Sequence, residues 1–318
     1  MKIIRSKIIH GNFDTDLFSI LENIPDNILY HSEHTLRHPK AIYYLASTRL
    51  YESFEECLNL LQNYDNSNNQ RTFFLAYKEV LDSLMSFIDD TYNILKCFYP
   101  ASSVRKNIIF AHKWVEQADK KTYNDYNSRI TNYREKLAPI VNKIKHEHGR
   151  FRSIEFVTSI GNIYGYFIEG VESDGTVYPD KSIHKPYKGF PTAISFNRDL
   201  KFHIINFFDV AHQLKVVISK FISKKHNITL PNATHNGSKD TQILQICSMI
   251  ANLPNLFFYD EYDKQIPEVK IYSDQELEFI YGNNKIIQPY VNAKISVETT
   301  ITDGTSKYFK FRVPYWQS

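Results

Sequence analysis

Four segments of the chain carry apolar residues at every third or fourth position, the spacing that places them on one face of an α-helix. The pattern predicts four long helices, over about 41–64, 73–95, 122–148 and 197–221. Gly149 is suited to end the third helix, and Asn197 or Asp199 to cap the start of the fourth. Pro139 lies inside the third helix and either kinks it or restarts it, since proline lacks the amide hydrogen that the helix needs.

The period changes between the third and the fourth predicted helix. Residues 154–178 are rich in β-branched and aromatic side chains, with turn signals at Gly161 and Gly175. Alternating runs broken by such turns are typical of a β-hairpin. The sequence therefore predicts a β insertion over about 153–195, before the fourth helix.

The last third of the chain has a different pattern from the first two thirds. A polar linker at 224–239 leads to a short predicted helix at about 241–252, and strand-like runs then occupy roughly 266–313. These runs predict a small antiparallel sheet. The expected fold is α+β, in three parts: an N-terminal segment (1–40), a four-helix domain with the β insertion (41–223), and a C-terminal, mostly antiparallel α+β domain (240–318).

The distribution of charge along the chain says more about a binding partner than the overall composition does. The chain of 318 residues is 42 % hydrophobic and 14 % aromatic, enough to bury a substantial core. Its net charge of +3 hides two basic blocks, 105–152 and 181–226, each with a net charge of +7. Basic blocks indicate an anionic partner, most commonly nucleic acid. The alternative is that they form two separate solvated helix faces.

Most familiar chemistry is missing from the sequence. Cys57, Cys97 and Cys247 lie far apart, which argues against a disulfide framework and a local zinc site. The sequence shows no phosphate-binding glycine loop, serine-nucleophile elbow or zinc-binding helix motif, so we expect no cofactor and no metal. Neither a signal peptide nor a run of about 20 apolar residues is present, so we expect a cytoplasmic protein that does not enter the membrane.

The end of the third predicted helix concentrates chemistry-bearing side chains. Residues 142–152 contain two histidines and four cations. Asn142 and His146 are four positions apart and share the solvent face of the helix, whereas His148 points inward. We predict that His146 transfers protons and that phosphate is bound by Asn142, Lys145, Arg150 and Arg152. The alternative is that these cations only cap the helix, with His148 hydrogen-bonded in the core.

Arg198, Asp199 and His203 form a second candidate site at the start of the fourth helix. An arginine followed by a polar residue, with a histidine four to six positions later, is the hallmark of the HEPN superfamily, which the four-helix arrangement over residues 41–222 also resembles. Members of that superfamily are often ribonucleases of toxin–antitoxin, CRISPR and abortive-infection systems. The resemblance implies a homodimer and metal-independent RNA cleavage, with Arg198 holding phosphate beside Asp199, His203 moving a proton, and the ribose 2′-hydroxyl attacking phosphorus.

The functional expectation joins the two candidate sites. We expect an RNA-binding protein of a prokaryotic defence or toxin system, and we add the hypothesis of metal-independent ribonuclease activity. A composite catalytic site requires Arg198 and His203 to lie within about 15 Å of His146. The alternative is a non-catalytic interaction protein, in which the helices are a scaffold and the C-terminal sheet binds a protein partner.

Overall fold

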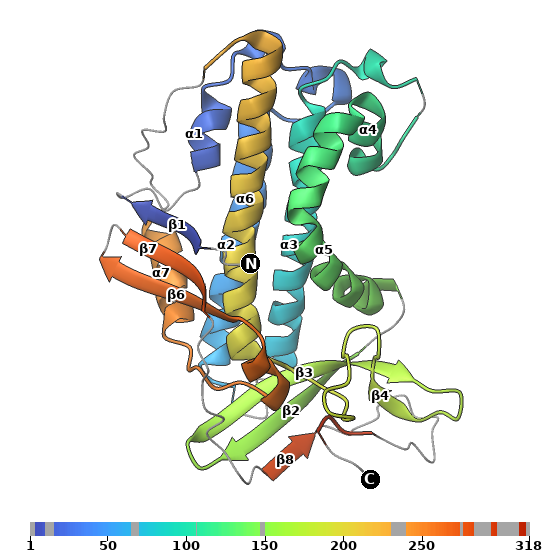
Figure 1. Ribbon diagram of the computed structural model, residues 1–318, viewed down its shortest axis with the longest axis vertical. Coiled ribbons are helices and arrows are strands. Elements are labelled where there is room, and N and C mark those ends of the chain that lie inside the picture. The colour runs from blue at the N-terminus through green and yellow to red at the C-terminus, as the bar shows by residue number, and fades with distance from the viewer. Residues whose placement is uncertain are drawn as a thin grey trace.

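The computed structural model describes residues 4–9, 16–64, 70–105, 107–146, 150–229, 240–273, 276–282, 294–297 and 312–315. The fold is α+β, as expected (Figure 1). Its α-helices are α1 (Asp16–Glu22), α2 (Pro39–Leu61), α3 (Gln70–Lys96), α4 (Ala111–Ala118), α5 (Lys120–His146), α6 (Phe196–His226) and α7 (Asp240–Ala251). Short 3-10 helices are η1 (Asp26–Ile28), η2 (His31–His34), η3 (Ala101–Ser103) and η4 (Tyr259–Asp263). The strands are β1 (Ile4–Ile9), β2 (Phe151–Thr158), β3 (Gly161–Val171), β4 (Val177–Pro179), β5 (Ile194–Ser195), β6 (Ile266–Ser273), β7 (Glu276–Gly282) and β8 (Lys294–Val297).

Helices α2, α3, α5 and α6 are the four long helices that the apolar pattern predicts. They run along the long axis of the molecule, with the 31-residue α6 at the centre (Figure 1). Helix α5 continues through Pro139, and its last part turns away from the direction of the first part, the kink expected where proline interrupts the hydrogen-bond ladder. Helix α6 begins after Ser195, and Asp199 is buried and does not cap the helix. The predicted stop of α5 at Gly149 falls outside the described residues.

Two antiparallel sheets complete the fold. The predicted hairpin is β2 and β3, and it lies in a sheet of order β4-β3-β2-β8, with β5 paired to β3. The second sheet has the order β1-β7-β6. Among the described C-terminal strands, β6 and β7 pair with each other as expected, but β7 also pairs with the N-terminal β1, and β8 pairs with β2. Helix α7 packs on α2 and β6, which places the C-terminal third against the helical part.

The larger sheet separates two hydrophobic cores. Successive side chains of a strand point to opposite faces, so Tyr166 and Ile168 of β3 join the large core among the helices. Ile163 and Phe167 point the other way, into a smaller core with Phe257, Phe258 and Tyr262 around η4. The segment around η4 thus covers the face of the sheet that the helices leave open.

Gly165 lies on this second face, where β5 and the η4 segment approach β3 closely. A Cβ atom at this position would stand 2.2 Å from the carbonyl oxygen of Ile194 and 2.4 Å from the ring of Phe258. No side chain can be accommodated there without moving backbone. Gly165 therefore lets β5 and the η4 segment pack directly on β3.

Candidate functional site

The carboxylate of Asp199 is the centre of a buried polar network. It accepts hydrogen bonds from the hydroxyl of Tyr77 on α3 and from that of Tyr166 on β3, the latter at 2.9 Å. Nε2 of His203, one turn later on α6, lies 3.4 Å from its Oδ2 atom. Nδ1 of His203 lies 3.0 Å from the hydroxyl of Tyr133 on α5. We call these five residues the Asp199 network, which ties α3, α5, α6 and β3 together.

Two of the predicted site residues are buried in the Asp199 network. His203 is only 2 % exposed and Asp199 6 %, so neither side chain can reach RNA bound at the surface. Burial alone would raise the pKa of Asp199, but the neighbouring His203 ring and the two tyrosine hydroxyls outweigh it and lower that pKa to about 2. A buried carboxylate that stays charged and accepts two hydroxyl hydrogen bonds is a structural element of the core.

Arg198, the third residue of the motif, points away from the network. Its Nη2 atom donates a hydrogen bond to the carbonyl oxygen of Gln265, at 2.8 Å. The side chain is half-buried and forms no ion pair with any described carboxylate. Arg198 therefore remains a candidate for binding phosphate, although the histidine of its motif does not accompany it to the surface.

The end of α5 presents part of the predicted cluster to solvent. Asn142 and His146 are exposed, as the helical spacing predicts, and so is Arg150. Lys145 is exposed too, but it pairs with Asp82 at 3.2 Å. His148, which we expected to point inward, lies outside the described residues.

Arg152 is a further correction, because it is not available to RNA. The side chain is 5 % exposed, and its Nε atom donates to Glu169 on the neighbouring strand. A buried cation that is already paired has no vacant position for a phosphate, and breaking such a pair is costly. Arg152 thus stabilises the β2–β3 hairpin.

The composite site with His146 does not form. The ring of His203 contacts Tyr133, which precedes His146 by thirteen positions on α5. This separation corresponds to about 20 Å along a helix, beyond any direct contact. The bend of α5 also carries its last turns away from α6 (Figure 1). The two predicted sites are therefore separate.

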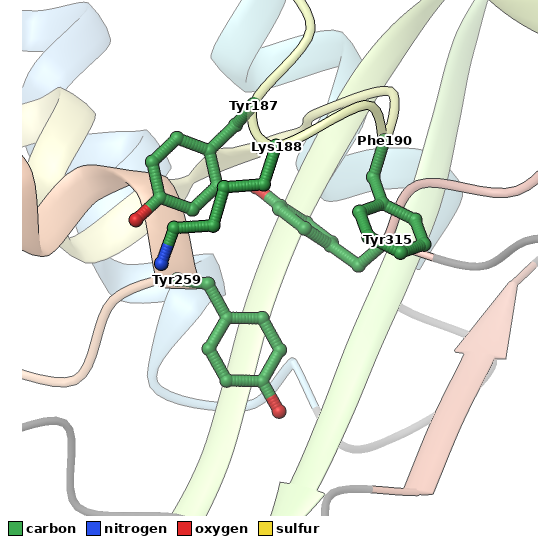
Figure 2. A pocket seen from close by; sticks show the side chains of 5 residues that line it. All are labelled: Tyr187, Lys188, Phe190, Tyr259 and Tyr315. Atoms are coloured by element: carbon green, nitrogen blue, oxygen red, sulfur yellow. The ribbon is translucent and has the colours of Figure 1, made fainter.

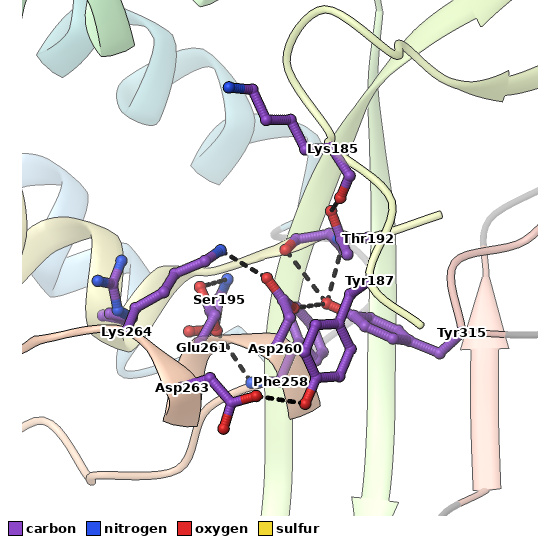
Figure 3. A network of polar contacts seen from close by, with 12 residues as sticks. Lys185, Tyr187, Thr192, Ser195, Phe258, Asp260, Glu261, Asp263, Lys264 and Tyr315 are labelled. Carbon is purple, nitrogen blue, oxygen red and sulfur yellow. Dashed lines mark hydrogen bonds and ion pairs between the residues drawn. The ribbon is translucent and has the colours of Figure 1, made fainter. Parts of the chain in front are cut away.

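A polar junction joins the start of α6 to η4. Glu261, only 1 % exposed, accepts hydrogen bonds from the amide of Phe258 at 2.9 Å and from that of Ser195 at 3.2 Å (Figure 3). Neighbouring Asp260 pairs with Lys264 and accepts a hydrogen bond from the hydroxyl of Tyr315. We call the region formed by residues 185–198 and 258–265 the α6–η4 junction. Its carboxylates fix the two segments relative to each other.

Burial raises the pKa of Glu261 to about 7, although the nearby Arg198 guanidinium favours the charged form. The ordinary value is 4.5, so between these two values the folded protein holds a proton that the unfolded chain has released. Stability must then fall as the pH rises through this window.

Glu261→Gln is expected to remove this part of the pH dependence. In the wild type, ionisation of Glu261 lowers the free energy of unfolding by roughly 2 kcal/mol as the pH rises from about 5 to about 7.5. Urea unfolding of both proteins at the two pH values measures the effect. If the difference in stability between the two proteins were the same at both pH values, the raised pKa would be wrong.

Three cations from separate parts of the chain lie within electrostatic reach of one another beside the junction. Lys136 of α5 lies with its ammonium 4.9 Å from the ring centroid of Phe202, and burial lowers its pKa, as do the charges of Arg198 and Lys264. Lys264 pairs with Asp260, but neither Lys136 nor Arg198 has an ion-pair partner in the described part of the chain. The charges of Arg198 and Lys264 disfavour the charged form of Lys136, and a bound anion would relieve that repulsion.

A hollow of about 190 Å³ opens beside Asp260, which pairs with Lys264 and accepts a hydrogen bond from Tyr315 in the wall of the hollow. It is lined by the side chains of Tyr187, Lys188, Phe190, Tyr259 and Tyr315 (Figure 2). The hydroxyl of Tyr187 donates to Asp263, the residue before Lys264, so the hollow and the cations share the η4 segment. Its aromatic lining, with a lysine at the edge, is chemically unlike the rest of the junction.

Sequence reasoning did not identify Lys136, Lys264 or the hollow. The separations between residues 136, 198 and 264 are too large for any local pattern to connect them. A signal existed only at 187–190, where Tyr-Lys-Gly-Phe lies between two prolines in a basic segment. Such a stretch is typical of a tight turn that displays aromatic side chains.

The remaining observations concern metals, cysteines and membranes. Among the described residues, no group of three or more histidine, cysteine or acidic side chains is placed to hold a metal ion. Cys57, Cys97 and Cys247 are buried and unpaired, and burial raises the pKa of the Cys97 and Cys247 thiols to about 12. Within the part of the chain that the structure describes, no helix combines the length and the apolar character needed to span a bilayer.

No protein family model, curated protein or solved structure matches this chain.

Proposed function

We propose that the protein binds single-stranded RNA at the α6–η4 junction, with phosphate held by Lys136, Arg198 and Lys264. The observation that carries the proposal is the convergence of these cations from separate parts of the chain, two of them without an ion-pair partner among the described side chains. Cations beside accessible aromatic rings are the combination that proteins use to bind single strands, and the rings that line the hollow are partly exposed. The two basic blocks of the sequence contribute Lys136 and Arg198, one each.

A binding measurement with matched charge variants tests the proposal. The variant Lys136→Ala/Arg198→Ala is expected to weaken binding of a labelled single-stranded RNA by about tenfold or more, since two phosphate contacts are lost. The slope of log K against log salt should also become shallower by about 1.4, because each phosphate contact on a single strand contributes about 0.7. Fluorescence anisotropy at several salt concentrations gives both quantities.

The control is Lys121→Ala/Lys224→Ala, which removes the same charge from the opposite ends of the same two helices. Both control lysines are exposed and unpaired in the described structure. Lys224 lies roughly 40 Å from Arg198 along α6. Equal losses of RNA affinity in the two double variants would show that only the total charge matters. The junction would then not be the RNA-binding site. Absence of RNA binding by the wild type would reject the function itself.

The proposal of RNA cleavage is tested with the same RNA in EDTA. The accessible histidine of the predicted catalytic set is His146, since His203 lies in the core. Comparison of the wild type with His146→Ala decides whether any cleavage depends on the end of α5, where Asn142, Lys145 and Arg150 form a second exposed surface.

The resemblance to the HEPN superfamily adds an oligomeric state and a biological role to the proposal. The helix order on which it rests is that of α2, α3, α5 and α6, with the β insertion before α6. It implies a homodimer, which light scattering measures, and a role in a prokaryotic defence or toxin system. The competing proposal, a non-catalytic interaction protein, is favoured if neither RNA binding nor cleavage is found.

A further inference from the structure

We infer that the hollow lined by Tyr187, Lys188, Phe190, Tyr259 and Tyr315 receives one unstacked base of the bound strand. This inference rests on the proposed function for the identity of the ligand, and it adds a base-binding subsite to the phosphate-binding cations. Figure 2 shows the five side chains gathered around one space, with Lys188 beside Tyr187 and Phe190 beside Tyr315.

The size and the lining of the hollow select a single planar ring. Its volume of about 190 Å³ is below the 300–1,000 Å³ typical of pockets for whole drug-sized ligands. Aromatic side chains form most of its wall, and a base stacks on such rings whatever its identity, since each base has a π face. The sugar and the phosphate would remain outside, in reach of the cations.

The walls of the hollow are held in strained backbone conformations. Tyr187 and Phe190 exchange two backbone hydrogen bonds, at 2.9 and 3.0 Å, across a two-residue turn. Lys188 and Gly189 in this turn have φ angles of 50° and 86°, the signature of a type I′ hairpin, in which asparagine or glycine is easier to place than lysine. Tyr315 has a φ of 60°. Two of the four non-glycine residues with positive φ in the described structure therefore line this hollow.

The rest of the structure supports this strained arrangement. The hydroxyl of Tyr315 donates to Asp260 and accepts from the amide of Ala193 at 3.1 Å, while its own amide donates to Pro191 at 2.9 Å. Strained conformations persist only where surrounding contacts enforce them, and they concentrate at binding sites. The hollow is thus a preformed site.

The charge around the hollow favours a nucleotide base over an aromatic side chain of a protein partner. Lys185 and Lys188 are exposed on the loop that forms its edge, and neither has an ion-pair partner in the described part of the chain. Lys264 follows the Asp263 that fixes Tyr187. A ring that carries a phosphate satisfies this environment, whereas the ring of a phenylalanine or tyrosine brings no negative charge.

Ligand-observed NMR with small probes tests the subsite separately from RNA binding. The probes are adenosine 5′-monophosphate, ribose 5-phosphate, which lacks the base, and N-acetylphenylalanine amide. We expect saturation transfer from the protein to the base protons of the mononucleotide. The signal should fall at least about fivefold in Tyr259→Ala and in Phe190→Ala, since base stacking on an aromatic side chain contributes about 1–3 kcal/mol.

The control variant is Phe110→Ala, which removes an aromatic ring that is 65 % exposed in the loop before α4, outside the hollow. It should leave the base signal unchanged. Because Tyr315 also holds the fold together, Tyr259 and Phe190 are the residues to replace. Thermal unfolding of each variant verifies that the fold is intact, and Tyr187→Phe, which keeps the ring, should retain the signal.

Each outcome decides one of the two proposals. No transfer to the base protons, or transfer that survives both alanine substitutions, overturns the base subsite even if RNA binds through the cations. Transfer to the phenylalanine amide alone overturns it in favour of a protein partner. Mononucleotide binding in the hollow without RNA binding keeps the subsite and rejects the proposed function.

Discussion

Asp199→Ala is expected to lower the free energy of unfolding by about 3–5 kcal/mol, the range for breaking a buried ionic partnership. The substitution leaves the hydroxyls of Tyr77 and Tyr166 without their acceptor and His203 without its neighbouring charge, all inside the core. Buried polar groups that lose a partner cannot recover it from water. Urea unfolding followed by circular dichroism measures the loss.

The matched control is Asp209→Ala, which removes a half-buried carboxylate from the same helix and loses a hydrogen bond from Gln213. Its expected cost is about 1 kcal/mol. Asp199→Asn retains an oxygen acceptor, so its loss of stability should lie between those of Asp199→Ala and Asp209→Ala. It remains informative if Asp199→Ala does not fold. Equal stability of the Asp199 and Asp209 variants would show that the Asp199 network contributes nothing beyond an ordinary hydrogen bond.

Gly165→Ala is expected to destabilise the protein by about 4 kcal/mol or more, because the new Cβ meets backbone and a buried ring. The carbonyl oxygen of Ile194 cannot yield without disturbing the pairing of β5 with β3, and Phe258 cannot yield without disturbing the smaller core. Thermal unfolding measures the effect. The hollow should also be disturbed, since Phe258 packs against Tyr315 with 5.5 Å between ring centroids.

Gly170→Ala on the same strand is the control for this prediction. Its added Cβ would find its nearest neighbours at 3.1 Å, so a shift of a few tenths of an ångström accommodates it. We expect a loss of about 1 kcal/mol there. If both glycine variants had the same stability, the close packing at Gly165 would not be a determinant of the fold.

Local periodicity was sufficient to locate the long helices but not the way distant segments pair. The apolar patterns that predict α2, α3, α5 and α6 are long, and a helical period repeated over several turns is hard to mistake. Helix α1 is only 7 residues long, and it was not predicted. The pairing of β8 with β2 also escaped prediction, because a strand pattern reports which face is apolar and does not report the partner.

The candidate site illustrates the same limit at the level of side chains. Asp199 was predicted to cap the helix, because polar residues near a helix start usually do so, and His203 was predicted to move a proton of bound RNA. Their burial depends on Tyr77, Tyr133 and Tyr166, which come from three other elements and supply the hydroxyls. By contrast, the outward position of Asn142 and His146 was predicted, since it follows from helical phase alone.

The pairing of β1 with β7 has a consequence for synthesis of the chain on the ribosome. Strand β1 is translated roughly 270 residues before its partner β7. At 5–20 residues per second, β1 waits roughly 15–55 s for a partner. Unpaired strand edges are prone to association during such a delay. The three-stranded sheet therefore cannot be completed until the long segment between β1 and β7 has been translated.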